Sequence, residues 1–274
     1  LGNNSNSDEG SFVFTRPTLN HRLYMIWDYR DTNVPAPCDA GMDVVFIFDY
    51  TASMSAQIEA AKSGVANIIS TVESQSSPND YRLGLVIADE YDSATVSNYS
   101  SDTEYTSLPS GQKNVNTGQG SKFQWITAME KMSTNNDTSF SAQLNKLNND
   151  TSGLSLGDGK GVPEPIDLAL SLVVENNFAG TFRDNIARYI VIITDAAPGG
   201  DDDTFTQADI TEINRLKNVC ISNYIKVIVL GNGVGANLNS VYPWRELATG
   251  TGGSWNASYD IATVQAEIVN GCSI

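Results

Sequence analysis

From Gly41 onward, short apolar runs alternate with longer segments in which apolar positions recur at helical spacing. Continuous runs of Val, Ile, Leu and Phe are typical of strands that are buried on both faces. The pattern predicts such strands over 43–49, 81–89, 187–195 and 224–231, and a short edge strand over 252–258. It predicts helices over 54–72, 139–147, 164–176, 204–218, 243–250 and 260–271. Residues 91–121, rich in Ser, Thr, Asn and Gly, are expected to form a hairpin or long loops.

The order of these elements predicts an α/β fold. Strands and helices that alternate along the chain, with continuously apolar strands, form a mainly parallel sheet covered by helices on both faces. We therefore expect a Rossmann-like, three-layer α/β/α domain over 41–272. Residues 1–40 are expected to be an N-terminal extension and linker, because the first ten residues are polar and a Pro-containing segment precedes the first strand. Since the chain begins with Leu1, we expect a processed product or a fragment of a longer chain.

Charge and composition exclude several classes of function. Lys and Arg number 16 against 32 Asp and Glu, so the net charge is −16, which opposes binding to nucleic acid or to anionic membranes. No apolar run approaches the roughly 20 residues that a membrane-spanning helix needs, so direct membrane insertion is not expected. The one histidine, His21, lies in the polar N-terminal region, and no phosphate-binding glycine loop is present. We therefore expect no catalytic residues and no enzyme activity.

Polar side chains follow two of the predicted strands where each strand ends. Asp49 ends the first strand and is followed by Thr51 and Ser53, and Asp195 ends the strand 187–195. In parallel sheets, ligands bind at the carboxyl ends of the strands. Hydroxyl and carboxylate oxygens are hard donors that suit Mg²⁺ or Mn²⁺. The alternative is that Asp49, Thr51 and Ser53 only cap the following helix.

These segments resemble the motifs of the von Willebrand factor A (vWA) family. The run DYTAS (49–53) is similar to its Asp-x-Ser-x-Ser signature, with Thr51 in place of the first Ser, and IITDAAPGG (192–200) resembles its Thr-Asp segment. The resemblance covers about 41–272 and implies the family's Rossmann-like fold and a metal-ion-dependent adhesion site. It implies that Thr51 and Ser53 bind the metal directly, whereas Asp49 and Asp195 act mostly through water.

The third motif of this resemblance is the loop GDGKGVPEP (157–165), which is similar to the second metal loop of members that carry Pro-Glu before a helix. It implies Glu164 as a further ligand, with Asp158 as the alternative, because this loop is longer than the usual form. Glu164 could instead interact favourably with the dipole of the helix that follows, and Asp158 could be present only because Asp favours turns. The expected ion is Mg²⁺, with Mn²⁺ or Ca²⁺ as alternatives. No acidic pair follows Ser53, so an adjacent calcium site is not expected.

Two classes of function agree with this reading. The first is an extracellular, metal-dependent adhesion or ligand-binding module, in which the cation bridges to an acidic group of a protein partner. The second is a structural or assembly module of a cell appendage or virus particle, which packs against neighbouring subunits and whose metal site is incidental. Both place the protein outside the cell, secreted or on a cell or virion surface.

Three cysteines are present: Cys38, Cys220 and Cys272. An odd number leaves one unpaired, and Cys220 precedes a predicted buried strand, where a buried thiol is the simplest expectation. Cys38 and Cys272 bracket almost the whole domain, which favours a disulfide and an oxidising compartment, and family members with flanking cysteines support this pairing. Three free thiols in a cytosolic protein are the alternative.

The Cys38–Cys272 prediction can be checked by mass spectrometry. A disulfide across so long a loop stabilises the fold by about 5 kcal/mol at most through loop-closure entropy. Alkylation of the denatured, unreduced protein should modify only Cys220, and reduction should expose two further thiols. Three alkylated cysteines without reduction would contradict the pairing and the extracellular assignment with it.

Overall fold

The computed structural model describes residues 40–75, 80–92, 99–118, 122–157, 159, 163–199, 202, 204–231 and 238–272. Internal contacts divide the chain into two units, Leu1–Pro35 and Ala36–Ile274, and every described residue belongs to the second. Cys38 lies outside the described residues, so the predicted disulfide with Cys272 stays a prediction. Cys220 is a buried free thiol, as expected.

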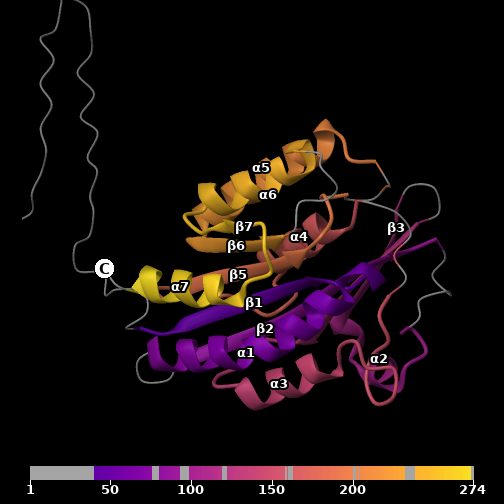
Figure 1. Cartoon of the computed structure of the whole chain (residues 1–274), viewed down its shortest axis with the longest axis horizontal. Coiled ribbons are helices and arrows are strands. Elements are labelled where there is room, and N and C mark those ends of the chain that lie inside the picture. Colours follow the sequence, from indigo (N-terminus) through magenta and orange to yellow (C-terminus); the bar gives the residue numbers. More distant parts are fainter. Residues whose placement is uncertain are drawn as a thin grey trace, which may run out of the picture. The chain divides into compact units, whose positions relative to one another are not determined.

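Within the described residues, seven strands form one sheet in the order β3-β4-β2-β1-β5-β6-β7 (Figure 1). The central strand β1 (Met42–Asp49) pairs in parallel with β2 (Tyr81–Tyr91) and with β5 (Ala187–Thr194). Parallel pairing continues through β6 (Ile225–Gly231) to β7 (Trp255–Asn256). On the other side, β4 (Phe123–Glu130) and β3 (Lys113–Thr117) form an antiparallel hairpin beside β2. The sheet is therefore mainly parallel, as the sequence predicts.

Helices cover both faces of this sheet (Figure 1). The helices that pack on one face are α1 (Ser55–Gln75), α3 (Asp137–Lys146) and α7 (Ile261–Cys272). Those on the other are α4 (Ile166–Asn176), α5 (Gln207–Ser222) and α6 (Leu238–Gly250). The short elements are η1 (Ala52–Met54), α2 (Thr103–Ser107) and η2 (Ser110–Gln112). The Rossmann-like, three-layer α/β/α architecture is confirmed.

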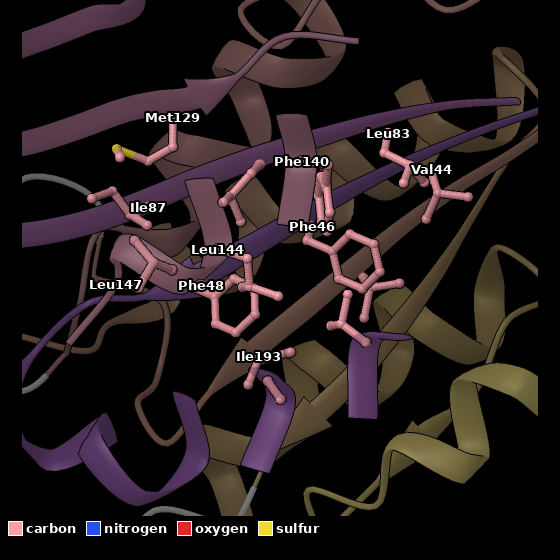
Figure 2. Packing of buried hydrophobic residues seen from close by; sticks show 14 of the residues in the cluster. Val44, Phe46, Phe48, Leu83, Ile87, Met129, Phe140, Leu144, Leu147 and Ile193 are labelled. Atoms are coloured by element: carbon pink, nitrogen blue, oxygen red, sulfur yellow. The ribbon is translucent and has the colours of Figure 1, made fainter. Parts of the chain in front are cut away.

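Two cores result from the alternation of side chains along β1. Phe46 and Phe48 point to the face that carries α1, α3 and α7, whereas Val45 and Ile47 point to the face that carries α4, α5 and α6. Figure 2 shows the first of these cores, with Phe46 close to Phe140 of α3; the ring centroids are 5.4 Å apart. Because β1 is buried on both sides, its sequence is apolar without interruption from Val44 to Phe48.

The structure differs from the sequence-based elements most clearly at β4 and at α6. The hairpin predicted within 91–121 includes β4, which lies beyond that range; the buried polar residues Gln124 and Thr127 interrupt the apolar pattern of this strand. Helix α6 begins at Leu238, ahead of the start at Pro243 that the sequence predicts. Within the described part of the chain, no helix is both long enough and apolar enough to cross a bilayer.

A buried acid at the amino end of β1 joins three segments of the chain. Asp43 is fully buried and accepts hydrogen bonds from Arg82 Nε at 2.9 Å, Arg183 Nη2 at 2.8 Å and the Arg183 backbone N–H at 2.9 Å. Arg82 lies on β2, and Arg183 lies in the turn that leads into β5. The pairing thus ties together the strands on both sides of β1.

We expect Asp43→Ala to lower the free energy of unfolding by about 3–5 kcal/mol, because it leaves the partly buried guanidinium of Arg82 without a carboxylate partner and Arg183 with the more exposed Asp80 alone. Urea unfolding with an unchanged m-value would measure this loss. The control is Asp184→Ala, which removes an exposed partner of Arg188 and should change stability little. Equal stability of Asp43→Ala and the wild type would contradict this role.

Candidate metal site

Two acidic residues meet at the carboxyl edge of the sheet because they follow neighbouring parallel strands. Asp49 is the last residue of β1 and is fully buried, and Asp195 follows directly after β5. Since β1 and β5 pair in parallel, both strands end at the same edge. The arrangement expected from the sequence, with Asp49 and Asp195 close together, is present.

Two hydroxyl groups connect these carboxylates in one continuous chain. Thr51 Oγ1 donates to Asp49 Oδ1 at 2.7 Å, and the Thr51 backbone N–H reaches the same oxygen at 3.1 Å. Ser53 Oγ donates to Asp195 Oδ1 at 3.3 Å. The oxygens Thr51 Oγ1 and Ser53 Oγ are 3.1 Å apart. The side chains of Asp49, Thr51, Ser53 and Asp195 therefore converge on one small region.

This chain of hydrogen bonds contains three polar contacts but only two hydroxyl hydrogens that could be donated to them. Each hydroxyl has one hydrogen to donate and two lone pairs that accept. The two hydrogens of Thr51 and Ser53 cannot fill three contacts, namely Thr51 to Asp49, Ser53 to Asp195, and Thr51 to Ser53. If both hydrogens point to carboxylates, the two hydroxyl oxygens face each other with lone pairs only. A cation held by both oxygens would relieve that repulsion, so the residues fit a hard metal ion.

Thr194, the last residue of β5, also supports this arrangement. Its hydroxyl donates to Asp49 Oδ2 at 2.9 Å and accepts the backbone N–H of Ala196 at 3.0 Å. Burial, together with the charge of Asp195, raises the pKa of Asp49 to about 6, although the hydrogen bonds from Thr51 and Thr194 act to lower it. The Asp49 carboxylate is thus oriented by hydrogen bonds on both oxygens and is costly to ionise.

Glu164 approaches the site from the loop before α4. Its backbone N–H donates to Ala197 O at 3.0 Å, and its own carbonyl accepts from Gly199 N at 3.0 Å, which joins this loop to the segment after Asp195. The side chain is 4% exposed, and its Oε2 has no hydrogen-bond partner among the described residues. Burial, followed by the charges of Asp49 and Asp89, raises the pKa of Glu164 well above its usual range. Asp158, the alternative ligand, lies outside the described residues.

A third strand-terminal acid, Asp89 near the end of β2, was missed by the sequence analysis. It is fully buried, and burial raises its pKa well above the usual range, with a further contribution from Asp49. The signal that could have found it is the one used for Asp49 and Asp195, an acid at the carboxyl end of a parallel strand.

Carboxylates alone do not make a metal site here. In the described ranges, no group of three or more His, Cys, Asp or Glu side chains is arranged to hold a metal ion. The candidate set depends instead on the hydroxyl oxygens of Thr51 and Ser53. A site of this kind needs both hydroxyls and the acids that orient them.

Comparisons with known proteins gave matches among solved structures and identified no family for this chain. No family model and no curated protein matches the sequence. Two structures of proximal thread matrix protein 1 from the mussel byssus, in different crystal forms, resemble this chain with a TM-score of 0.49 and 13% sequence identity. Each similarity covers 85% of this chain and 48% of the mussel protein, so the chain spans about half the length of that protein.

The raised pKa of Asp49 predicts how the metal-free protein responds to pH. The pKa rises from 3.8 to about 6 on folding, so the stabilisation from a protonated Asp49 is complete below 3.8 and is lost as the pH rises through about 6. Between pH 5 and 7.5 the free energy of unfolding in EDTA should fall by about 1.4 kcal/mol from this residue alone.

Urea unfolding in EDTA at the two pH values measures this difference. Asp49→Asn is the matched variant, and it should lose the part of the pH dependence that comes from Asp49. The pH dependence that comes from Asp89 and Glu164 has the same sign and should remain. If Asp49→Asn and the wild type show the same pH dependence, the assignment to Asp49 is wrong.

Proposed function

We propose that this chain contains a domain of the von Willebrand factor A type that binds a divalent cation and, through it, an acidic group of a protein partner. The single observation that carries the proposal is the pair of hydroxyl oxygens, Thr51 Oγ1 and Ser53 Oγ, which lie 3.1 Å apart between two carboxylates with too few hydrogens for all their contacts. Mg²⁺ is the preferred ion, with Mn²⁺ or Ca²⁺ as alternatives, because every donor is a hard oxygen.

Each residue has a distinct role in this proposal. Thr51 and Ser53 offer hydroxyl lone pairs, and Asp49 and Asp195 accept the hydroxyl hydrogens and so turn those lone pairs toward the ion. Glu164 offers the carboxylate oxygen that lacks a partner in the described part of the chain. When bound, the cation supplies positive charge and an exchangeable position for a partner's carboxylate oxygen.

The surrounding charge makes partner binding depend on the cation. The ionisable side chains of the proposed site, Asp49, Glu164 and Asp195, are all acids, and the whole chain has a net charge of −16. An acidic side chain of a partner would be repelled from this edge of the sheet unless a cation were present. We propose that the protein acts outside the cell, where divalent cations are abundant, consistent with the Cys38–Cys272 pairing expected from the sequence.

The experiment is selection of peptides from a random displayed library on the immobilised protein in Mn²⁺, followed by elution with EDTA. The recovered peptides should share an Asp or Glu, and replacing it with Asn or Gln should abolish binding. Ser53→Ala should lose all Mn²⁺-dependent capture, because it removes one of the paired oxygens. Ser63→Ala, an exposed serine on α1 whose hydroxyl only donates to Ala60 O, should bind like the wild type.

Peptides that remain bound in EDTA, or that bind Ser53→Ala as well as the wild type, would contradict this mechanism. The structural or assembly module, with neighbouring subunits as its partners, would then be the better hypothesis. Circular dichroism of both variants keeps loss of folding apart from loss of binding.

A further inference from the structure

The carboxylate of Asp89 is buried in the sheet without a charge partner in the described part of the chain. Its backbone is one step beyond Ala88, which pairs with Asp49 of β1, so Asp89 lies level with Tyr50. The residue is fully buried and forms no ion pair with a described Lys or Arg. The backbone N–H groups of Glu90 and Gly159 and the Tyr91 side chain lie near its carboxylate and act to lower its pKa, but none of them makes a hydrogen bond of normal geometry to it. Burying a carboxylate in this way is costly, so its position needs a physical reason.

Asp89 is in direct contact with the loop that leads to Glu164. A Cβ atom added to Gly157 would overlap both oxygens and Cγ of the Asp89 carboxylate, so only glycine fits there. The Gly157 backbone N–H donates to Tyr50 O at 3.0 Å. Gly157, at the start of the loop, is therefore held between Tyr50, which follows β1, and the carboxylate of Asp89 on β2.

Two residues further on, the same loop contacts the proposed metal ligands. Gly159 has a φ of +60°, and a Cβ atom there would lie 3.1 Å from Thr51 Cβ and 3.2 Å from Glu164 Oε1. Gly159 also interacts with Asp89, since its backbone N–H acts to lower the pKa of that carboxylate. Gly157 thus faces Asp89, and Gly159 faces Thr51 and Glu164.

We propose that Asp89 is a positioning residue for the metal site: its carboxylate holds Gly157 and Gly159 in place, and the loop in turn sets the spacing between Thr51 and Glu164. The inference rests on the proposed function, because it concerns the same site. Asp89 acts here through the loop and does not touch the ion.

This role separates stability from metal affinity. A buried carboxylate without an ion-pair partner carries a desolvation cost, so its removal should not lower the stability of the metal-free protein. A purely structural residue would lower stability when replaced and leave the affinity of the folded protein unchanged. A positioning residue does the opposite, because groups that orient metal ligands typically change affinity by about 10- to 100-fold.

The test uses four variants and three measurements, the first of which is urea unfolding in EDTA for the stability of the metal-free protein. The variants are Asp89→Ala, Asp89→Asn, Gly157→Ala and the double variant Asp89→Ala/Gly157→Ala, with Gly111→Ala as the control because nothing lies within 4 Å of a Cβ there. Calorimetry gives the Mn²⁺ dissociation constant. Amide hydrogen exchange of Gly157 and Gly159, followed by NMR in EDTA, reports the loop without any metal.

Asp89→Ala and Gly157→Ala should each raise the dissociation constant by about 10- to 100-fold and speed amide exchange in the loop, with apo stability of Asp89→Ala unchanged or higher. Asp89→Asn keeps the shape and one acceptor oxygen, so it should stay within about threefold of the wild type. The double variant should bind no more weakly than Asp89→Ala, because the added methyl group then occupies the space that the carboxylate leaves.

Additive losses in the double variant, or wild-type loop exchange in Asp89→Ala, would overturn the inference. So would wild-type Mn²⁺ affinity in Asp89→Ala. If the wild type itself binds no Mn²⁺, the proposed function fails, and the exchange measurement in EDTA still decides whether Asp89 holds the loop.

Discussion

The site is governed by the electrostatic cost of placing acidic side chains at the buried carboxyl edge of a parallel sheet. Asp49, Asp89 and Glu164 are each buried, and within the described residues none of them forms an ion pair with Lys or Arg. Isolated buried carboxylates are expensive in a low-dielectric environment. Their pKa values are accordingly raised, and the protein bears this cost in the metal-free state.

The two ends of β1 treat a buried acid in opposite ways. At the amino end, Asp43 is neutralised by Arg82 and Arg183, and the resulting contacts join three segments of the fold. At the carboxyl end, Asp49 receives only hydroxyl and backbone donors, from Thr51 and Thr194. A compensated charge stabilises the scaffold, whereas an uncompensated one leaves negative potential for an ion from solution. The same strand therefore carries a structural acid and a candidate functional one.

Backbone contacts bring the parts of the site together from distant positions in the chain. The segment after β5 is hydrogen-bonded to the loop before α4 through Glu164, Ala197 and Gly199. That loop is also fixed to the end of β1 through Gly157 and Tyr50. Movement of one segment would thus be transmitted to the others. The spacing of Thr51, Glu164 and Asp195 therefore depends on all the segments that meet at the carboxyl edge of the sheet.

The sequence by itself determined the parallel part of the sheet, its helices, and the group Asp49, Thr51, Ser53 and Asp195. These could be predicted because each strand is buried on both faces, so its own residues show where it begins and where its apolar run ends in an acid. Only the tertiary structure decided the position of β4, whose buried Gln124 and Thr127 obscure the strand pattern, and the complete burial of Asp89. A buried carboxylate without an ion-pair partner can be recognised only from its surroundings. The contact between Asp89 and Gly157 arises only in the folded chain, where Gly157 packs against the end of β2.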